Sequence, residues 1–439
     1  MAGVPSPCAL GLDLGSSGLR LAACNASGDL LVEQAAAYPA AFSDPTSWRE
    51  GLVDLCARLS PELRASVGAI AIDGTSGTLL LCHRDGSLLE GALGQALSYA
   101  TACPEQVRRA RQLSEGDDRA DASSDGAAAS PAASASGSLA RALRLLEAAP
   151  APGAELLLRH QADWLMGWLL ADWRWGEATN NLRLGWDPLH WRWQGTIAFQ
   201  PWSPALPRIC ASGSVLGRLA AATAHSLGLS ASCQVVAGST DANAAVLAAA
   251  PGPGDGVAVL GTTLVLKQFC SQPLQGPGLS CHRVAGRWLV GGASNSGAGV
   301  LGQFFSPAQL AELSRQIDPS RPTGLELRPL PGRGERFPVD DPDLEPILGP
   351  RPVSDVHFLQ ALLEGLAAIE QAGWQRLSSL GAPPIQRVIS LGGGARNPQW
   401  RRLRQQRLGV PVLNRPGLSA ALGMARLAAS TLKPTPELR

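Results

Sequence analysis

Short apolar strands joined by small-residue turns recur in both halves of the chain and limit the folds that it can adopt. LGLDLGSSGLRLAACNASGDLL (residues 10–31) has the pattern of a strand, a Gly/Ser turn and a second strand. Residues 70–89 and 257–269 repeat this pattern. Because each turn leads into another strand, these units are not the βαβ units of a Rossmann sheet. The repetition predicts an internally duplicated α/β protein.

The order of segments along the 439 residues indicates two large lobes. The pattern restarts at the apolar strand CQVVAG, so we expect an N-terminal lobe over residues 1–233 and a C-terminal lobe over residues 234–439. Residues 114–138 are a low-complexity Ser/Ala/Asp stretch and predict a flexible surface insertion in the first lobe. Residues 326–352 are rich in Pro and Gly and predict an extended crossing loop.

Composition excludes several classes of protein. Hydrophobic residues make up 45% of the chain and charged residues 17%, which provides enough apolar material for packed cores. The net charge of +1 removes the electrostatic case for nucleic acid or an anionic membrane as a partner. The 9 cysteines are scattered singly and the 6 histidines lack metal-ligand spacing. With no signal peptide and no apolar run of about 18 residues, we expect a cytoplasmic monomer or homodimer, in a plastid or cyanobacterial cytosol for example.

The first turn combines a carboxylate with groups that can bind phosphate. Asp13 ends an apolar strand, and the turn Gly15-Ser16-Ser17-Gly18 follows it. Backbone N–H groups and hydroxyls in such a turn can cradle phosphate oxygens, and Asp13 could hold Mg²⁺ through water. Arg20, on the outgoing strand, could meet a transferred phosphoryl group. The alternative is an Asx-type hairpin turn without a ligand.

The second half has a counterpart of this turn and a further carboxylate. Gly261-Thr262-Thr263 could grip the other side of a triphosphate. Lys267, on its outgoing strand, is expected to be a plain exposed strand charge. Asp241 lies between strand CQVVAG and an Ala-rich helix, where it could cap the helix or accept a proton from a substrate hydroxyl that attacks phosphorus.

A glycine triplet before the last part of the chain is a candidate nucleotide contact. Gly393 and Gly394 stand between an apolar strand and a helix, where a flat ligand could approach the backbone. Asn397 could hydrogen-bond a base or ribose, and Trp400 could flank a purine. The alternative is a Gly-rich helix entry with no nucleotide. His160 is a candidate for sugar hydroxyls, with a structural polar cluster as the alternative. The Trp-rich stretch 164–202 could wall a sugar pocket, although the i, i+4 spacing of Trp164 and Trp168 favours the core for these two.

Taken together, the motifs LGLDLGSSGLR, AGSTDANAA, LGTTLVL and SLGGGARNPQW resemble, in this order, those of the FGGY carbohydrate kinases. The resemblance implies a two-lobed actin/hexokinase/Hsp70-like (ribonuclease H-like) α/β fold, with duplicated domains around a central cleft. It also implies a sugar-binding N-terminal lobe and an ATP-binding C-terminal lobe. AIDGTSGTLLL, HQADWL, NNLRLGWD and FPVDDPDLEPILGPRP are similar to signatures of the cyanobacterial and plant group regarded as D-ribulose kinases.

The resemblance assigns a role to each candidate residue. Asp241 would be the catalytic base, and Asp13 would contact the sugar and the Mg²⁺-bound phosphate. The substrate side would comprise Asp13, Ser17, Gly18, Leu19, Arg20, Ser76, His160 and Asp241. The ATP side would comprise Gly15, Ser16, Gly261, Thr262, Thr263, Gly297, Gly393, Gly394, Asn397 and Trp400.

The implied activity is transfer of the γ-phosphoryl group of ATP, with Mg²⁺, to the terminal hydroxyl of a ketopentose, D-ribulose before others. The alternatives are a D-xylulose kinase and a catalytically silent sugar- or nucleotide-binding regulator. Two positions depart from the family pattern: no acidic residue follows Tyr99 closely, and Ser419 stands where the family usually has Glu.

Overall fold

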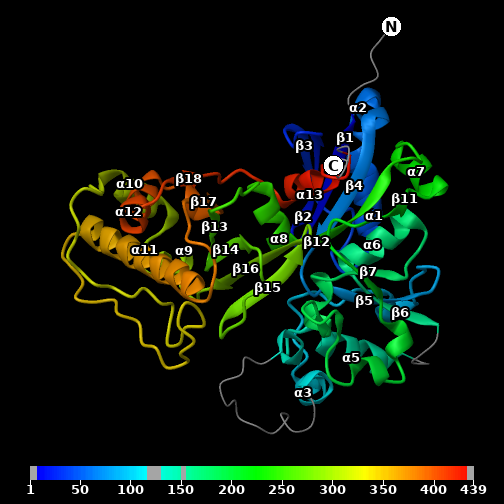
Figure 1. Cartoon of the computed structure of the whole chain (residues 1–439), viewed down its shortest axis with the longest axis horizontal. Helices are drawn as coiled ribbons and strands as arrows, with labels where there is room; N and C mark the ends of the chain where they lie inside the picture. The colour runs from blue at the N-terminus through cyan, green and yellow to red at the C-terminus, as the bar shows by residue number, and fades with distance from the viewer. Residues whose placement is uncertain (1–6, 116–129, 150–154, 433–439) are drawn as a thin grey trace.

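The computed structural model describes residues 7–115, 130–149 and 155–432 of the chain. It has two lobes, each built around a six-stranded sheet (Figure 1). None of the helices in these three ranges has the length and apolar content that crossing a bilayer requires. The cysteines are all free, and only Cys281 is not fully buried.

The N-terminal sheet is mixed, and its strands lie in an order different from that of the sequence. Across the sheet they are β3 (Leu30–Ala36), β2 (Gly18–Asn25), β1 (Cys8–Gly15), β4 (Val67–Gly74), β12 (Gln234–Thr240) and β11 (Val215–Arg218). β1 and β2 form the antiparallel hairpin expected from the first motif. β4 lies parallel to β1, and β12 parallel to β4.

Five strands of the C-terminal sheet repeat this arrangement, and the sixth strand lies at the opposite edge. Its order is β15 (Leu279–Val284), β16 (Arg287–Ala293), β14 (Leu264–Cys270), β13 (Asp255–Leu260), β17 (Arg387–Leu391) and β18 (Val412–Asn414). β13 pairs antiparallel with β14 on one side and parallel with β17 on the other, as β1 does with β2 and β4. The shared topology confirms the predicted duplication and the two-lobed α/β fold.

The remaining elements cover the sheets or form a smaller subdomain beside the first one. In the N-terminal lobe they are α1 (Pro45–Ala57), α2 (Pro61–Ser66), β5 (Leu79–His83), α3 (Val107–Glu115), α5 (Ser138–Ala148), β6 (Leu156–His160), α6 (Gln161–Leu170), β7 (Trp175–Glu177), β8 (Trp186–Asp187), β9 (Arg192–Trp193), β10 (Arg208–Cys210) and α7 (Ala221–Leu227). In the rest of the chain they are α8 (Asp241–Ala248), α9 (Ala298–Leu301), α10 (Pro307–Gln316), α11 (Asp355–Ser379), α12 (Pro398–Leu408) and α13 (Ala420–Ala429).

The two faces of the N-terminal sheet carry side chains of different size. Leu10, Leu12 and Leu14 of β1 pack into a core with Trp48 of α1. The opposite face presents small residues, among them Ala9 of β1 and Ala69 and Ala71 of β4. This division follows from the strand period of two, since alternate side chains point to opposite faces.

Helices α8 and α13 pack on the small-residue face, between the two sheets (Figure 1). A Cβ atom on Gly11 would lie 2.0 Å from the carbonyl oxygen of Ala421. A Cβ on Gly423 would lie 1.9 Å from the carbonyl oxygen of Ala244. The backbones of β1, α13 and α8 therefore touch directly, and we call this contact the α8–α13 seam.

Three expectations about organisation need correction or addition. Residues 70–89 form strands β4 and β5, but β5 pairs with β6 in a separate two-stranded sheet, so they are not a hairpin. β12 begins at Gln234 and lies in the N-terminal sheet, so that sheet extends past the boundary expected near residue 233. Of the Ser/Ala/Asp stretch, residues 116–129 lie outside the described residues, whereas Ala132, Ala133 and Ser138 are buried.

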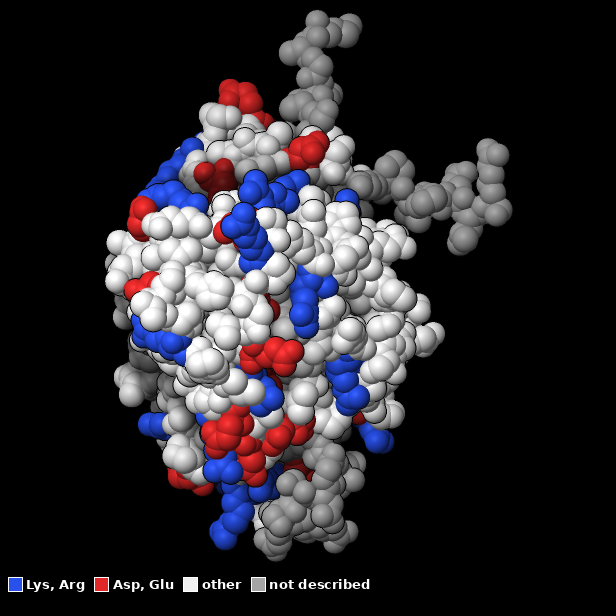
Figure 2. All heavy atoms as spheres, turned by 90° about the vertical axis from the view of Figure 1, so that its left-hand side faces the viewer, with Lys and Arg blue, Asp and Glu red and all other residues white. Residues whose placement is uncertain are grey.

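Residues 317–354, between α10 and α11, form no helix or strand and cross the C-terminal lobe, as the Pro/Gly-rich sequence predicts. On the end of this lobe, basic and acidic side chains are interspersed with uncharged ones (Figure 2).

Candidate active site

A hollow of about 500 Å³ gathers many of the predicted residues at the ends of β1, β4 and β12. Those that line it as expected are Asp13, Gly15, Ser16, Ser17, Arg20, Ser76 and Asp241. Also in the lining are Thr75, Tyr99, Arg183, Leu418, Ser419 and Ala420. The parallel strands β1, β4 and β12 all end here, which is why residues far apart in the sequence meet.

Asp13 is held in the wall of the hollow by its position near the end of β1. It is only 5% exposed, and Arg20 of the paired strand β2 places its Nη1 atom 3.5 Å from Asp13 Oδ2. Burial raises the pKa of Asp13, while a hydrogen bond from Asp73 and the charge of Arg20 lower it.

Asp73 is a functional candidate that the sequence reasoning missed. It lies beside Asp13 in the register of β1 and β4 and is fully buried. Neither of its carboxylate oxygens receives a hydrogen bond from a donor group of another described residue. Burial, together with the charges of Asp13 and Asp241, raises the pKa of Asp73 well above its ordinary value. We therefore interpret Asp73 as a neutral acid that donates a hydrogen bond to ionised Asp13.

Replacing Asp73 by Asn is expected to stabilise the protein, and more so as pH rises. A carboxyl group whose folded-state pKa is raised contributes stability below its unfolded pKa and loses it as pH rises through the folded pKa. An Asn side chain cannot ionise and can still donate to Asp13. Thermal denaturation should show Tm of Asp73→Asn exceeding that of the parent by more at pH 8 than at pH 5.

The exposed Asp54 of α1 provides the matched control, and Asp54→Asn should leave Tm close to the parental value at both pH values. A Tm gap for Asp73→Asn that shrinks as pH rises would contradict the neutral-acid interpretation.

Asp241 is the first residue of α8, directly after β12. Thr240 occupies the N-cap position, and Asp241 Oδ1 accepts from the backbone N–H of Ala242 at 2.7 Å, so Asp241 is not the capping residue. Burial raises the pKa of Asp241 to about 6, and the charge of Asp13 adds to this rise. A carboxylate with this pKa is mostly ionised at neutral pH and can accept a proton.

On the side expected to bind ATP, the structure brings the Gly261–Thr263 turn and Gly297 together. The backbone N–H of Ala298 donates to Gly261 O at 2.9 Å, and that of Gly299 donates to Thr262 O at 3.1 Å. A Cβ atom on Gly297 would lie 2.5 Å from Thr262 O, so only glycine fits against the turn. This pairing of loops leaves the Thr262 and Thr263 side chains at the end of the β13–β14 hairpin.

The glycine triplet divides into open and packed positions. A Cβ on Gly393 would meet nothing within 4 Å, so a ligand can approach the backbone there. Gly394 instead packs against Trp400, which is 3% exposed and belongs to the core of the C-terminal lobe. Asn397 caps α12, accepting from the N–H groups of Gln399 and Trp400 at 3.0 Å. Asn397 therefore serves as a helix cap and Trp400 as a buried support of the glycine loop, which is the structural alternative to base contacts.

Other expected residues lie outside the hollow. His160 is 1% exposed at the end of β6, with Nδ1 3.6 Å from Asp163 Oδ2, so we leave it out of the proposed site. Gly18 and Leu19 do not line the hollow either, and Leu19 is buried in the core. Lys267 is not an exposed charge: it is 5% exposed, donates to Ser280 Oγ at 2.6 Å, and burial lowers its pKa to about 8. No tryptophan lines the hollow in the described part of the chain.

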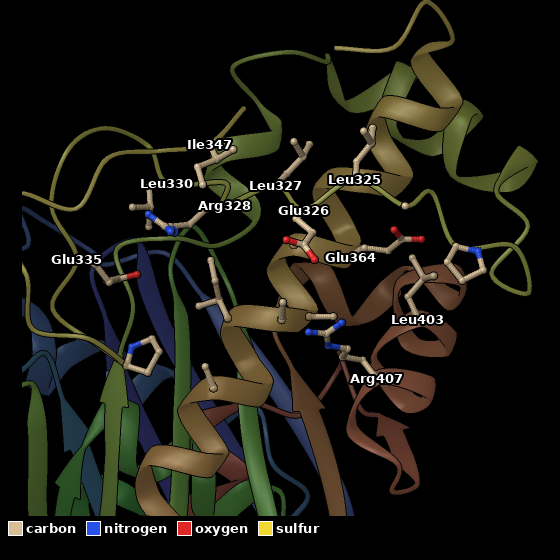
Figure 3. A pocket seen from close by; sticks show the side chains of 18 of the residues that line it. Leu325, Glu326, Leu327, Arg328, Leu330, Glu335, Ile347, Glu364, Leu403 and Arg407 are labelled. Atoms are coloured by element: carbon tan, nitrogen blue, oxygen red, sulfur yellow. The ribbon is translucent and has the colours of Figure 1, made fainter. Parts of the chain in front are cut away.

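A larger hollow of about 790 Å³ lies between the crossing loop and helices α11 and α12 (Figure 3). Several of its polar groups are already hydrogen-bonded within the protein. Glu364 accepts from Thr323 Oγ1 at 2.5 Å, and Arg407 Nε donates to Gln371 Oε1 at 2.8 Å. We therefore place the chemistry at the smaller hollow, where carboxylates meet.

The duplicated sheets have the two-domain α/β fold of sugar kinases. Solved structures agree: the chain matches xylulose kinase from Rhodospirillum rubrum with a TM-score of 0.79 and 21% identity, over 98% of this chain and 91% of that one. It matches Plasmodium falciparum glycerol kinase, solved with ADP, with a TM-score of 0.76 and 16% identity, over 98% and 91%. At these identities the likeness establishes the fold.

The sequence comparisons match part of the chain to a family of carbohydrate kinases. Residues 256–432 match the model of the FGGY family of carbohydrate kinases, C-terminal domain. L-fuculokinase from Salmonella typhi is 26% identical over 220 residues, which are 47% of this chain and 45% of that protein. The match therefore spans less than half of this curated relative. The C-terminal part of the chain carries an FGGY carbohydrate kinase domain.

Proposed function

We propose that this protein is an ATP-dependent kinase that phosphorylates the terminal hydroxyl of a ketopentose, with D-ribulose as the first candidate and D-ribulose 5-phosphate as the product. The observation that carries the proposal is the meeting of Asp241 and Asp13 at one hollow of a sugar kinase fold. The preference for D-ribulose rests on the motif resemblance alone.

Asp241 would act as the base. The sugar hydroxyl would donate a hydrogen bond to the Asp241 carboxylate and lose its proton to it as the oxygen attacks the γ-phosphorus atom. In a loose transition state the proton leaves late, so the placement of Asp241 at the end of β12 matters more than its basicity. The product is a phosphate ester, and ADP leaves.

ATP would be held mainly by backbone and hydroxyl groups. The Gly15–Ser17 and Gly261–Thr263 turns supply N–H and O–H donors, and Gly393 allows close approach of the nucleoside. In the described part of the chain, no three His, Cys, Asp or Glu side chains are grouped to hold a metal ion. A carboxylate such as Asp13 fits Mg²⁺ held chiefly through phosphates and water, and the ion would neutralise phosphate charge.

D-Xylulose kinase is the second candidate, favoured by the fold shared with the Rhodospirillum rubrum enzyme. A silent sugar- or nucleotide-binding regulator is the third candidate. The presence of both Asp13 and Asp241 at the hollow argues against it.

A coupled ADP-release assay over ketopentoses and pentitols tests the proposal. We expect sugar-dependent ADP release that requires Mg²⁺ and is fastest with a ketopentose. Release without sugar provides the baseline. Calorimetric binding of a sugar or ATP with no turnover of any sugar would instead support the regulator.

A further inference from the structure

Arg183 brings a cationic donor into the candidate active site that the proposed chemistry has not used. Its half-buried side chain lines the same hollow as Asp13 and Asp241. Nη2 donates to Ser136 Oγ at 3.2 Å, and no other hydrogen bond from this guanidinium is found within the described residues. The other cation of the hollow, Arg20, is already engaged with Asp13. The remaining N–H groups of the Arg183 guanidinium are therefore available to donate to a sugar in the hollow.

The turn that carries Arg183 is fixed by a buried polar network. Arg183 lies in the 3₁₀ turn Asn180–Leu184. Glu177, 1% exposed, accepts from the backbone N–H groups of Thr179 at 2.9 Å and Asn180 at 3.0 Å. Asn181 Nδ2 donates to Asp163 Oδ2 at 3.0 Å. These hydrogen bonds anchor the turn to the buried side chains of Glu177 and Asp163, so the backbone that carries Arg183 is fixed.

The same network reaches the catalytic strand. The hydroxyls of Thr179 and Ser239 lie 2.9 Å apart, and Ser239 stands two residues before Asp241 in β12. The turn bearing Arg183 and the strand end bearing the base are therefore joined by hydrogen bonds. A substrate bound in the hollow would meet a donor from the turn and an acceptor from the strand end.

Phosphorylation of the terminal hydroxyl places a demand on a ketopentose that Arg183 can meet. In the furanose form, the oxygen of that hydroxyl closes the ring onto the keto carbon, so it is not free to attack phosphorus. Only the open-chain form has both a free terminal hydroxyl and a ketone. A ketone oxygen can only accept hydrogen bonds. The carboxylates of Asp13 and Asp241 are also acceptors and cannot pair with it, so the ketone needs a separate donor.

We propose that Arg183 is a specificity-determining residue that donates a hydrogen bond to the ketone oxygen of an open-chain ketopentose. The inference rests on the proposed function. It predicts that the site selects the linear keto form. The hydroxyl that a pentitol has in place of the ketone can also accept from Arg183, but it can in addition donate to Asp13 or Asp241, so pentitol binding depends less on Arg183.

The test compares Arg183→Met and Arg183→Lys with the parent, using D-ribulose and D-xylulose as substrates and the pentitols ribitol and xylitol as substrates or competitive inhibitors. We expect Arg183→Met to lower kcat/KM for the preferred ketopentose by about 10- to 100-fold, mainly through KM, because a charged donor is lost. The KM or Ki for pentitols and the Kd for ATP should change less than about 3-fold. Arg183→Lys should lie between parent and Arg183→Met, since it keeps the charge but not the planar donors.

Arg109→Met serves as the matched control, because Arg109 lies on α3 of the same lobe with an exposed partner, Glu147. Arg109→Met should leave kcat, KM and Kd at their parental values. A parental Tm for Arg183→Met would show that this variant still folds. Equal losses for ketopentose and pentitol, or no loss for the ketopentose, would overturn the role of Arg183. A parent enzyme that turns over no ketopentose would instead overturn the proposed function, and this inference with it.

Discussion

Asp241→Asn is expected to lower kcat for sugar phosphorylation by about 10²- to 10⁴-fold, the contribution typical of a positioned base. The Asn side chain keeps the shape of the strand end but cannot take the proton of the attacking hydroxyl. KM for the sugar and Kd for ATP should stay close to parental values, because the rest of the hollow is unchanged. Sugar-dependent ADP release and calorimetry with ATP measure the two effects separately.

The exposed Asp340 of the crossing loop supplies a control, and Asp340→Asn should retain parental turnover. Near-parental kcat in Asp241→Asn would mean that another group accepts the proton. Asp13 would then be the next residue to replace, since it lines the same hollow.

Glu370→Ala is expected to reduce the free energy of unfolding by about 3–5 kcal/mol, because it leaves a guanidinium buried without its partner. Glu370 of α11 is 1% exposed, and Arg404 of α12 is fully buried. Arg404 Nε donates to Glu370 Oε2 at 2.5 Å and Nη2 to Oε1 at 2.8 Å, while Nη1 donates to Ser390 Oγ at 2.7 Å. These hydrogen bonds join α11, α12 and strand β17, which carries Ser390. Urea denaturation of parent and variant measures the loss.

The exposed pair Arg351 and Asp355, 2.8 Å apart, is the comparison within the same lobe. Asp355→Ala should cost at most about 1 kcal/mol, as surface pairs usually do. Replacing Glu370 and Arg404 together by Leu and Met should recover much of the stability lost in Glu370→Ala, since no unpaired charge remains. A double variant as unstable as the single one would show that packing, and not charge, dominates.

What the sequence predicts well here is local. The β1–β2 hairpin, the position of Asp13 near its turn and the strand-to-helix position of Asp241 follow from residues close together in the chain. Asp73 has the same local pattern as Asp13, an acid at the end of an apolar strand. Asp73 matters because β4 pairs in parallel with β1, about 60 residues earlier, and so places Asp73 beside Asp13. The hydrophobic periodicity of a segment does not predict which distant strand it pairs with.

The corrected expectation at Lys267 and the alternatives left open at the glycine triplet and at His160 have the same origin. A glycine loop followed by Asn397 and Trp400 is equally typical of a nucleotide contact and of a capped helix. The cap at Asn397 and the packing of Gly394 on Trp400 are three-dimensional contacts that the local sequence does not report. His160 and Lys267 are polar residues whose exposure is decided by which strand pairs beside them, so their burial could not be derived from their neighbours in sequence.

The α8–α13 seam has a consequence for how the two lobes can move. At its two closest points, Gly11 against Ala421 and Gly423 against Ala244, backbone meets backbone because no side chain stands between them. Leu422, Met424 and Leu427 fill the core around these points. Deep ridges and grooves resist displacement, whereas smooth, close-packed helices can slide by small steps while staying in contact. We therefore expect the lobes to open and close by shear along this seam, so that the enzyme can admit its substrates and then exclude water without uncovering its interlobe core.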